Sequence, residues 1–136
     1  MPFVIQEKWF TKEQIQKDRN ILYIFGDNFN RKGTGGQAKV CRDEPNCIGV
    51  VTKARPSHDH PDDYLNDKYL NYNIKTIVQD FGPAIKYLQE GGTVIFPADG
   101  IGTGLAMLKE KAPLTWSFLQ SYIRSEEHTS ELQSPC

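Results

Sequence analysis

Continuous runs of apolar residues alternate with longer polar segments along the chain. Three of these runs, residues 21–25, 47–53 and 93–97, lack the alternating polar positions of a half-exposed strand. We therefore expect three strands that are buried on both faces of a sheet. Residues 3–9 predict a further strand, at an edge of the sheet.

Apolar residues between the strands recur at helical spacing. Thr11, with Gln14 as its capping-box partner, predicts the start of one helix, and Gly82-Pro83 predicts a kink or a restart within another. The predicted helices cover residues 11–18, 36–44, 65–89 and 113–123.

Strands and helices alternate over 136 residues, which is typical of one α/β domain with a mainly parallel sheet covered on both faces. Ligands of such sheets bind beyond the carboxyl ends of the strands. Lys53 ends one predicted strand, and glycine-rich loops follow two others. We therefore expect a ligand site at this edge of the sheet.

The two loops are "GTGGQA" at residues 33–38 and "GIGTG" at residues 100–104. Glycine turns the chain through positive φ or lets the backbone approach a ligand closely. Backbone N–H groups in such loops often hold a phosphate. The two loops together favour a clamp whose amides enclose a diphosphate. The other interpretation, that the glycines only form tight turns, stays open.

Two well-known nucleotide-binding motifs do not match these loops. "GTGGQA" has the spacing G-x-G-x-x-A, but Gly33 lies eight residues after Phe25, whereas the dinucleotide fingerprint turns directly out of its strand. Lys53 stands where that fingerprint has an acid at the end of the next strand. A Walker A loop needs Gly-Lys before Ser or Thr, and neither loop has it.

Charge and hydropathy narrow the function classes. The formal charge of −1 disfavours a nucleic-acid-binding module, and the local basic cluster of Arg31, Lys32 and Lys39 flanks the first glycine loop. No apolar run approaches the ~20 residues of a membrane span. We therefore expect a cytoplasmic protein without a membrane partner.

The metal-ligating residue types do not form a known site. Cys41, Cys47 and Cys136 lack C-x-x-C spacing, which argues against a structural zinc or a disulfide framework. His58 and His60 have no evident third ligand, so we expect them in a solvated loop. No metal and no cofactor is expected.

Residues 124–136, "RSEEHTSELQSPC", are polar and break the helical pattern before them. This segment looks like the translation of a sequencing-library adapter. We therefore expect a single domain over residues 1–123, with the tail outside it.

Three segments taken together, "GDNFNRKGTGGQA", "IGVVTKARPS" and "VIFPADGIGTGLA", resemble the signature of macrodomains. The similarity covers about residues 21–123. Its nearest branch is the DNA- and glutamate-directed ADP-ribosyl glycohydrolases, which include the antitoxin macrodomains. The resemblance implies a three-layer α/β/α fold that binds ADP-ribose or a relative of it.

The resemblance also implies which residues contact the ligand. The distal ribose of ADP-ribose would meet Asn28, Gly35, Gly36, Gln37 and Ala38. Asp27 would satisfy backbone donors or bind the adenine amino group. The second loop would enclose the diphosphate, with Gly102 to Leu105 around it. The ligand contacts expected in and after this loop are Gly100, Ile101, Gly102, Thr103, Gly104 and Leu105.

Lys53 matches the lysine with which this branch attacks C1″ of the ribose to form a covalent intermediate. In the alternative interpretation Lys53 only pairs with a phosphate or with a loop acid such as Asp59. Where the branch has an acid after G-x-G-L, this chain has Ala106. Asp99 is the nearest replacement, and it could instead cap a turn.

Because the second catalytic residue is not where the resemblance requires it, binding is favoured over hydrolysis. The expected protein is a reader of ADP-ribosyl groups or a sponge for an ADP-ribose-derived signal. A sponge would suit a phage protein that counters bacterial defence. The alternative is an ADP-ribosyl glycohydrolase that acts through Lys53 on ADP-ribosylated nucleic acid or protein. Nucleic acid is expected as a partner only as such an ADP-ribosylated substrate.

Overall fold

The computed structural model describes residues 4–6 and 9–133, with side chains described for residues 9–125. Four strands form one sheet, and each described pair of neighbours is parallel. Their order in the sheet is β1 (Val4–Gln6), β4 (Thr93–Pro97), β2 (Ile21–Asn28) and β3 (Cys47–Lys53). The predicted parallel sheet and the edge position of its first strand are therefore confirmed.

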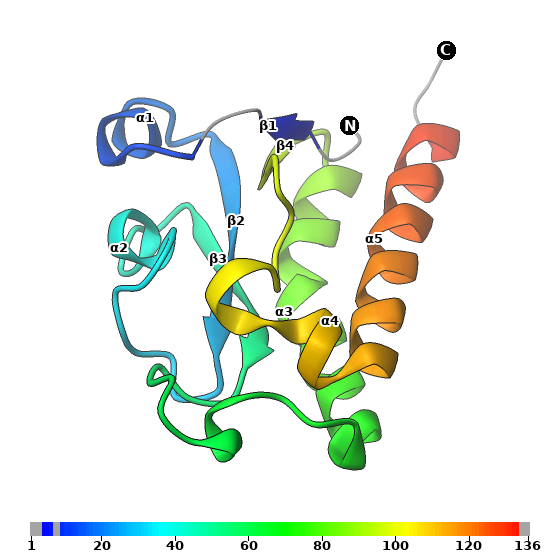
Figure 1. Cartoon of the computed structure of the whole chain (residues 1–136). Coiled ribbons are helices and arrows are strands. Elements are labelled where there is room, and N and C mark those ends of the chain that lie inside the picture. The colour runs from blue at the N-terminus through cyan, green and yellow to red at the C-terminus, as the bar shows by residue number, and fades with distance from the viewer. Residues whose placement is uncertain (1–3, 7–8, 134–136) are drawn as a thin grey trace.

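Helices cover both faces of the sheet, so the fold is a three-layer α/β/α arrangement (Figure 1). One face carries α1 (Lys12–Lys17) and α2 (Ala38–Cys41), and the other carries α3 (Leu70–Gln89) and α5 (Pro113–Gln133). The shorter helical segments are η1 (Pro61–Asp63), η2 (Asp67–Tyr69), η3 (Gly104–Ala106) and α4 (Leu108–Lys111).

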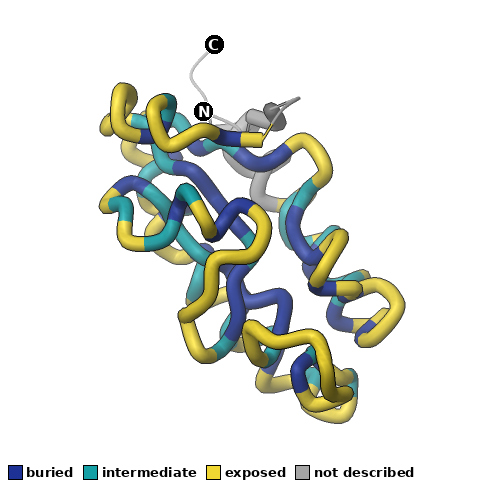
Figure 2. Tube along the Cα trace, turned by 60° about the vertical axis from the view of Figure 1, so that its left-hand side comes forward, coloured by how far each residue is buried: buried dark blue, intermediate teal, exposed yellow. Residues whose placement is uncertain are grey.

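Strand β2 divides its side chains between two layers of core. Tyr23 and Phe25 pack on the α1 and α2 side, whereas Ile24 packs on the α3 and α5 side. Successive side chains of a strand point to opposite faces, so a strand covered on both sides must be apolar throughout. Figure 2 shows buried residues along the strands and exposed residues along the connecting loops.

Of the strand predicted at residues 3–9, Val4–Gln6 form β1 and Trp9 lies outside the strand, while residues 3, 7 and 8 lie outside the described residues. Both β3 and β4 begin and end where the apolar runs do, but β2 continues three residues past Phe25, to Asn28. Gly26 makes this extension possible, because a Cβ there would lie 3.0 Å from Oγ1 of Thr52. The residues expected in a loop at Asp27 and Asn28 are therefore part of the sheet.

Two predicted helix starts are too early. The predicted helix at Gly36 begins only at Ala38, because Gly36 has a φ of 57° and cannot belong to a right-handed helix. The start predicted at residue 65 moves to Leu70, after the short segment η2. By contrast, the helix start at Thr11 is confirmed, since its side chain accepts a hydrogen bond from the Gln14 N–H at 3.1 Å.

Two predicted helix ends or breaks do not occur. Helix α3 passes through Pro83 without a restart, and buried Phe81 and Ala84 hold this part of the helix against the core. Helix α5 was expected to end at Ile123 and continues to Gln133. Helical order therefore extends into the segment that the sequence pattern places outside the domain.

Side chains cover part of the open edge of β3. Arg31 Nη2 bonds both carboxylate oxygens of Asp80, at 2.7 and 2.9 Å. Asp80 accepts a hydrogen bond from the N–H of Val51 at 2.8 Å, and Arg31 donates to the carbonyl of Gly49 at 3.3 Å. This ion pair therefore satisfies backbone groups that an edge strand leaves without a neighbouring strand.

Candidate functional site

The carboxyl ends of β2, β3 and β4 meet at a cavity of about 410 Å³. Every residue that the sequence predicts for the site lines this cavity. From β2 and the first glycine loop these are Asp27, Asn28, Gly35, Gly36, Gln37 and Ala38. From β3 and the second loop they are Lys53, Asp99, Gly100, Ile101, Gly102, Thr103, Gly104 and Leu105.

The second glycine loop owes its shape to repeated positive φ angles. Gly100, Gly102 and Gly104 have φ angles of 77°, 84° and 57°, a region that glycine enters without strain. A Cβ on Gly102 would lie 3.0 Å from Cδ2 of Leu108. Gly102 thus brings the loop close to the protein core, so a side chain there would disturb packing before it met a ligand.

The two glycine loops approach each other across the cavity. A Cβ on Gly35 would lie 3.4 Å from Cδ1 of Leu105, the last residue of the predicted second loop. Both loops are largely exposed, while Ile101 and Gly102 at the base of the second loop are buried. The arrangement gives two backbone segments that face a common space from opposite sides.

The carboxylate of Asp27 is bonded to neighbouring groups of the protein. This buried carboxylate accepts hydrogen bonds from Arg42, with Nη2 to Oδ1 at 2.6 Å, and from the N–H of Asn28 at 2.8 Å. The interpretation that Asp27 satisfies backbone donors is borne out by the Asn28 contact. The sequence gives no local signal for the contact between Arg42 and Asp27, because these two residues lie 15 positions apart.

Two further predicted contact residues use their side chains within the protein. Nδ2 of Asn28 donates to the carbonyl of Lys32 at 2.7 Å, and Gln37 exchanges two hydrogen bonds with the backbone of Phe10. Both residues line the cavity, but their amides hold the first glycine loop and the segment before α1 in place.

Lys53 is buried at the end of β3. Its Nζ donates to the carbonyls of Arg55, at 2.8 Å, and of Ser57, and it lies 4.6 Å from the ring centroid of Tyr64. Burial lowers the pKa of Lys53, while the negative charges of Asp63 and Asp59 act in the opposite direction. The lysine is thus held in place by backbone acceptors, with its ammonium form disfavoured by desolvation.

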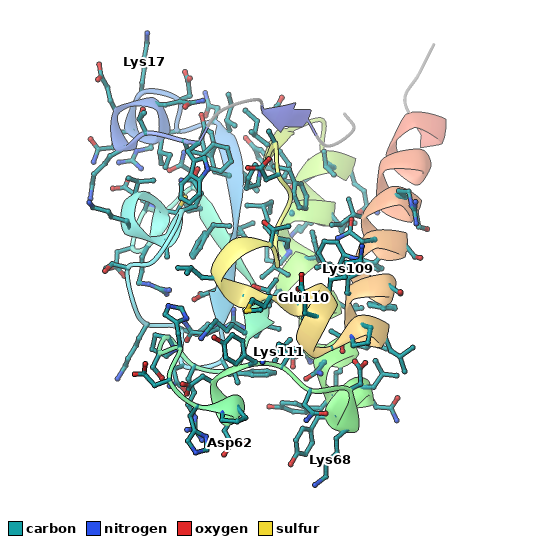
Figure 3. The ribbon with its side chains drawn as sticks, in the orientation of Figure 1. Lys17, Asp62, Lys68, Lys109, Glu110 and Lys111 are labelled. Atoms are coloured by element: carbon teal, nitrogen blue, oxygen red, sulfur yellow. The ribbon has the colours of Figure 1, made fainter. Side chains whose placement is uncertain are left out.

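A second lysine meets the same aromatic ring. Nζ of Lys111, on α4, lies 4.9 Å from the ring centroid of Tyr64 (Figure 3). Tyr64 therefore links the segment after β3 to the helix that follows the second glycine loop, through two cation–π contacts.

The described cavity lining contains two carboxylates, those of Asp27 and Asp99. Asp99 lines the cavity from an exposed position, and Ala106 also lines it. Of the charged side chains at the cavity, Arg42 is paired with Asp27. Lys32 and Lys53 then stand against Asp99, so positive charge predominates among the lining residues.

The lining residues that the sequence did not predict include Trp9, Arg42 and His58. Both histidines expected in a solvated loop are exposed; His60 caps η1, and His58 also lines the cavity. Within the described part of the chain, no group of three or more His, Cys, Asp or Glu residues is placed to hold a metal ion. In the same residues, no helix combines the length and the apolar character needed to cross a membrane.

Comparison with known proteins identifies a family and no relative of known function. No curated protein and no solved structure matches the chain. A family of unknown function (DUF7831) matches residues 5–122. This range includes every predicted site residue and, apart from Val4, all residues of the four strands. The chain therefore belongs to the family DUF7831.

Proposed function

We propose that the protein binds ADP-ribose or an ADP-ribose-derived nucleotide in the cavity at the carboxyl edge of the sheet. The observation that carries this proposal is that both glycine-rich loops line one cavity, together with Asn28 and Lys53. A volume of about 410 Å³ lies within the usual range for small-molecule sites, roughly 300–1,000 Å³.

Electrostatics supports an anionic ligand. A diphosphate brings negative charge to a space where Lys32 and Lys53 outnumber Asp99. The positive φ angles of the second loop turn successive peptide groups, and loops of this kind present N–H groups to phosphate oxygens. A neutral or cationic ligand would not compensate the positive charge of Lys32 and Lys53 at the cavity.

We favour binding over hydrolysis. Glycoside cleavage needs an acid or base near the leaving group, and Ala106 supplies none. The two carbonyl acceptors of Lys53 also suit a lysine that donates hydrogen bonds at a fixed position. A protein of this kind acts as a reader of ADP-ribosyl groups or as a sponge for a signalling nucleotide.

One observation favours the second candidate, an ADP-ribosyl glycohydrolase. Burial lowers the pKa of Lys53, which raises the share of free amine at a given pH. The amine would attack C1″ of the distal ribose, form a bond to that carbon and displace the modified group, while Asp99 accepts the proton that the amine loses and passes it to the leaving group. Water would then regenerate the lysine and release ADP-ribose.

Calorimetry with ADP-ribose tests the binding proposal. Lys32→Glu places a negative charge at the cavity and should weaken binding at least tenfold. Lys17→Glu makes the same charge change on α1, outside the residues that line the cavity, and serves as the matched control (Figure 3). Absence of ADP-ribose binding to the wild type, or equal affinities in both variants, would overturn the proposal.

A further inference from the structure

The cavity has an exposed tryptophan at its rim. The side chain of Trp9 is 60% exposed although it lines the cavity beside the first glycine loop. A Cβ on Gly36 would lie 3.5 Å from Cη2 of Trp9, so the indole ring lies directly against the glycine backbone. An exposed indole gains nothing for the core, and a ligand ring is one partner that would cover it.

The segment that carries Trp9 is held firmly in place. The next residue, Phe10, is buried and packs edge-on against Tyr23, with ring centroids 5.0 Å apart. Gln37 binds the backbone of Phe10 on both sides, accepting its N–H at 2.5 Å and donating to its carbonyl at 3.3 Å. Trp9 is therefore anchored one residue away, to the same loop that its ring contacts.

Leu105 lies on the other side of the glycine pair. Its side chain is 55% exposed, lines the cavity and comes within 3.4 Å of the position of a Cβ on Gly35. Trp9 and Leu105 thus flank Gly35 and Gly36, which carry no side chains, and all four residues line the cavity. We call these four residues the aromatic slot.

We propose that the aromatic slot holds a planar heterocycle attached to the distal ribose of the ligand, so that the preferred ligand is dinucleotide-like rather than free ADP-ribose. This inference rests on the proposed function and on the expectation, implied by the resemblance to macrodomains, that Gly35 and Gly36 contact the distal ribose and the second loop holds the diphosphate. A ring on C1″ of that ribose then lies next to Trp9, where stacking buries its face. The apolar slot and the basic interior of the cavity match a ligand with a planar ring at one end and a diphosphate in the middle.

NAD⁺ and ADP-ribose form a matched pair of probes, because they differ by the nicotinamide ring on the distal ribose. Stacking of a base on an aromatic side chain contributes about 1–3 kcal/mol, which corresponds to roughly five- to 150-fold in affinity. We expect wild-type protein to bind NAD⁺ at least about fivefold more tightly than ADP-ribose. In Trp9→Ala the preference for NAD⁺ should disappear, so that the two ligands bind equally, and Trp9→Phe should keep part of that preference.

Fluorescence reports on the same contact directly. The chain has two tryptophans, and Trp116 is packed against the core, so Trp116→Phe leaves Trp9 as the single indole. NAD⁺ should quench its emission, and ADP-ribose should quench it much less.

The outcomes separate the two proposals. If ADP-ribose binds and NAD⁺ has no advantage, or if the advantage persists in Trp9→Ala, the aromatic slot proposal is overturned and the proposed function stands. An equal loss of both ligands in Trp9→Ala also overturns it, because Trp9 would then contact a part that the two ligands share. If neither ligand binds the wild type, the proposed function fails together with the slot.

Discussion

Arg42 joins the end of β2 to the first glycine loop through the buried carboxylate of Asp27. Its Nη2 lies 2.6 Å from Oδ1 of Asp27, while its Nε donates to the carbonyl of Gly33 at 2.7 Å. The same Nη2 donates to the carbonyl of Lys32 at 3.1 Å. One planar guanidinium thus fixes a strand end and two loop carbonyls at the cavity rim.

Because of this contact, truncation of the Arg42 side chain should greatly lower the free energy of unfolding. Arg42→Ala leaves the buried Asp27 charge without its closest cation, and breaking a buried pair in this way costs about 3–5 kcal/mol. Arg55→Ala is the control, because Arg55 Nη1 lies 3.8 Å from Asp63 and its side chain is 53% exposed, which limits the loss to about 1 kcal/mol. Urea unfolding measures both, and equal losses would contradict the role given to Arg42.

Asp67 caps the first turn of α5 from a distant part of the chain. Its carboxylate accepts hydrogen bonds from the N–H groups of Leu114 and Thr115, at 2.8 and 2.9 Å, and from the Thr115 hydroxyl at 2.9 Å. Asp67→Ala should lower the free energy of unfolding by about 0.5–2 kcal/mol, the range for lost helix caps. Asp62→Ala, on an exposed acid, provides the comparison (Figure 3).

The pKa of Asp67 adds a pH dependence to this prediction. Desolvation raises it, but the hydrogen bonds from Leu114 and Thr115 outweigh that effect, and the pKa lies below its usual value. The stabilisation is therefore complete above the unfolded pKa of about 3.9 and is lost as the pH falls through the lower folded pKa. The stability difference between wild type and Asp67→Ala should shrink in acid, and a constant difference down to low pH would contradict this.

Lys53 should produce a pH effect at the alkaline end. Its folded pKa is lowered, so between that value and the unfolded pKa of about 10.4 the unfolded chain binds more protons than the folded one. The stability of the wild type relative to Lys53→Met should therefore rise with pH through this window. Lys17→Met is the control, and a relative stability that falls with pH would show that the folded state raises the pKa of Lys53.

The binding proposal predicts an absence of turnover. The wild type should release no ADP-ribose from ADP-ribosylated DNA or protein, and borohydride should trap no adduct at Lys53. Ala106→Asp should introduce measurable release if residue 106 lies near the ribose, because it supplies the missing carboxylate. Multiple turnover by the wild type that is lost in Lys53→Ala would establish the glycohydrolase instead.

The sequence predicted those elements whose signal is local. The strands Cys47–Lys53 and Thr93–Pro97 were predicted with their bounds because burial on both faces requires apolar residues at every position. The glycine loops and Lys53 were placed at one edge because the carboxyl ends of parallel strands lie together.

The missed features depend on contacts between distant residues. Trp9 lies beside Gly36, and the next residue, Phe10, is bound by Gln37, 27 positions away. The bonds from Arg42 to Asp27 and from Asn28 to the carbonyl of Lys32 likewise depend on the fold. Sequence motifs located the cavity, whereas which lining groups are free to meet a ligand depends on tertiary hydrogen bonds.

The ion pair of Arg31 and Asp80 along β3 also bears on how copies of the chain behave at high concentration. An uncovered strand edge can pair with the strand of another molecule, which leads to edge-to-edge aggregation. With the carbonyl of Gly49 and the N–H of Val51 already bonded to side chains, an incoming strand would first have to displace a bidentate ion pair. This part of the β3 edge is thereby kept from serving as a template for self-association.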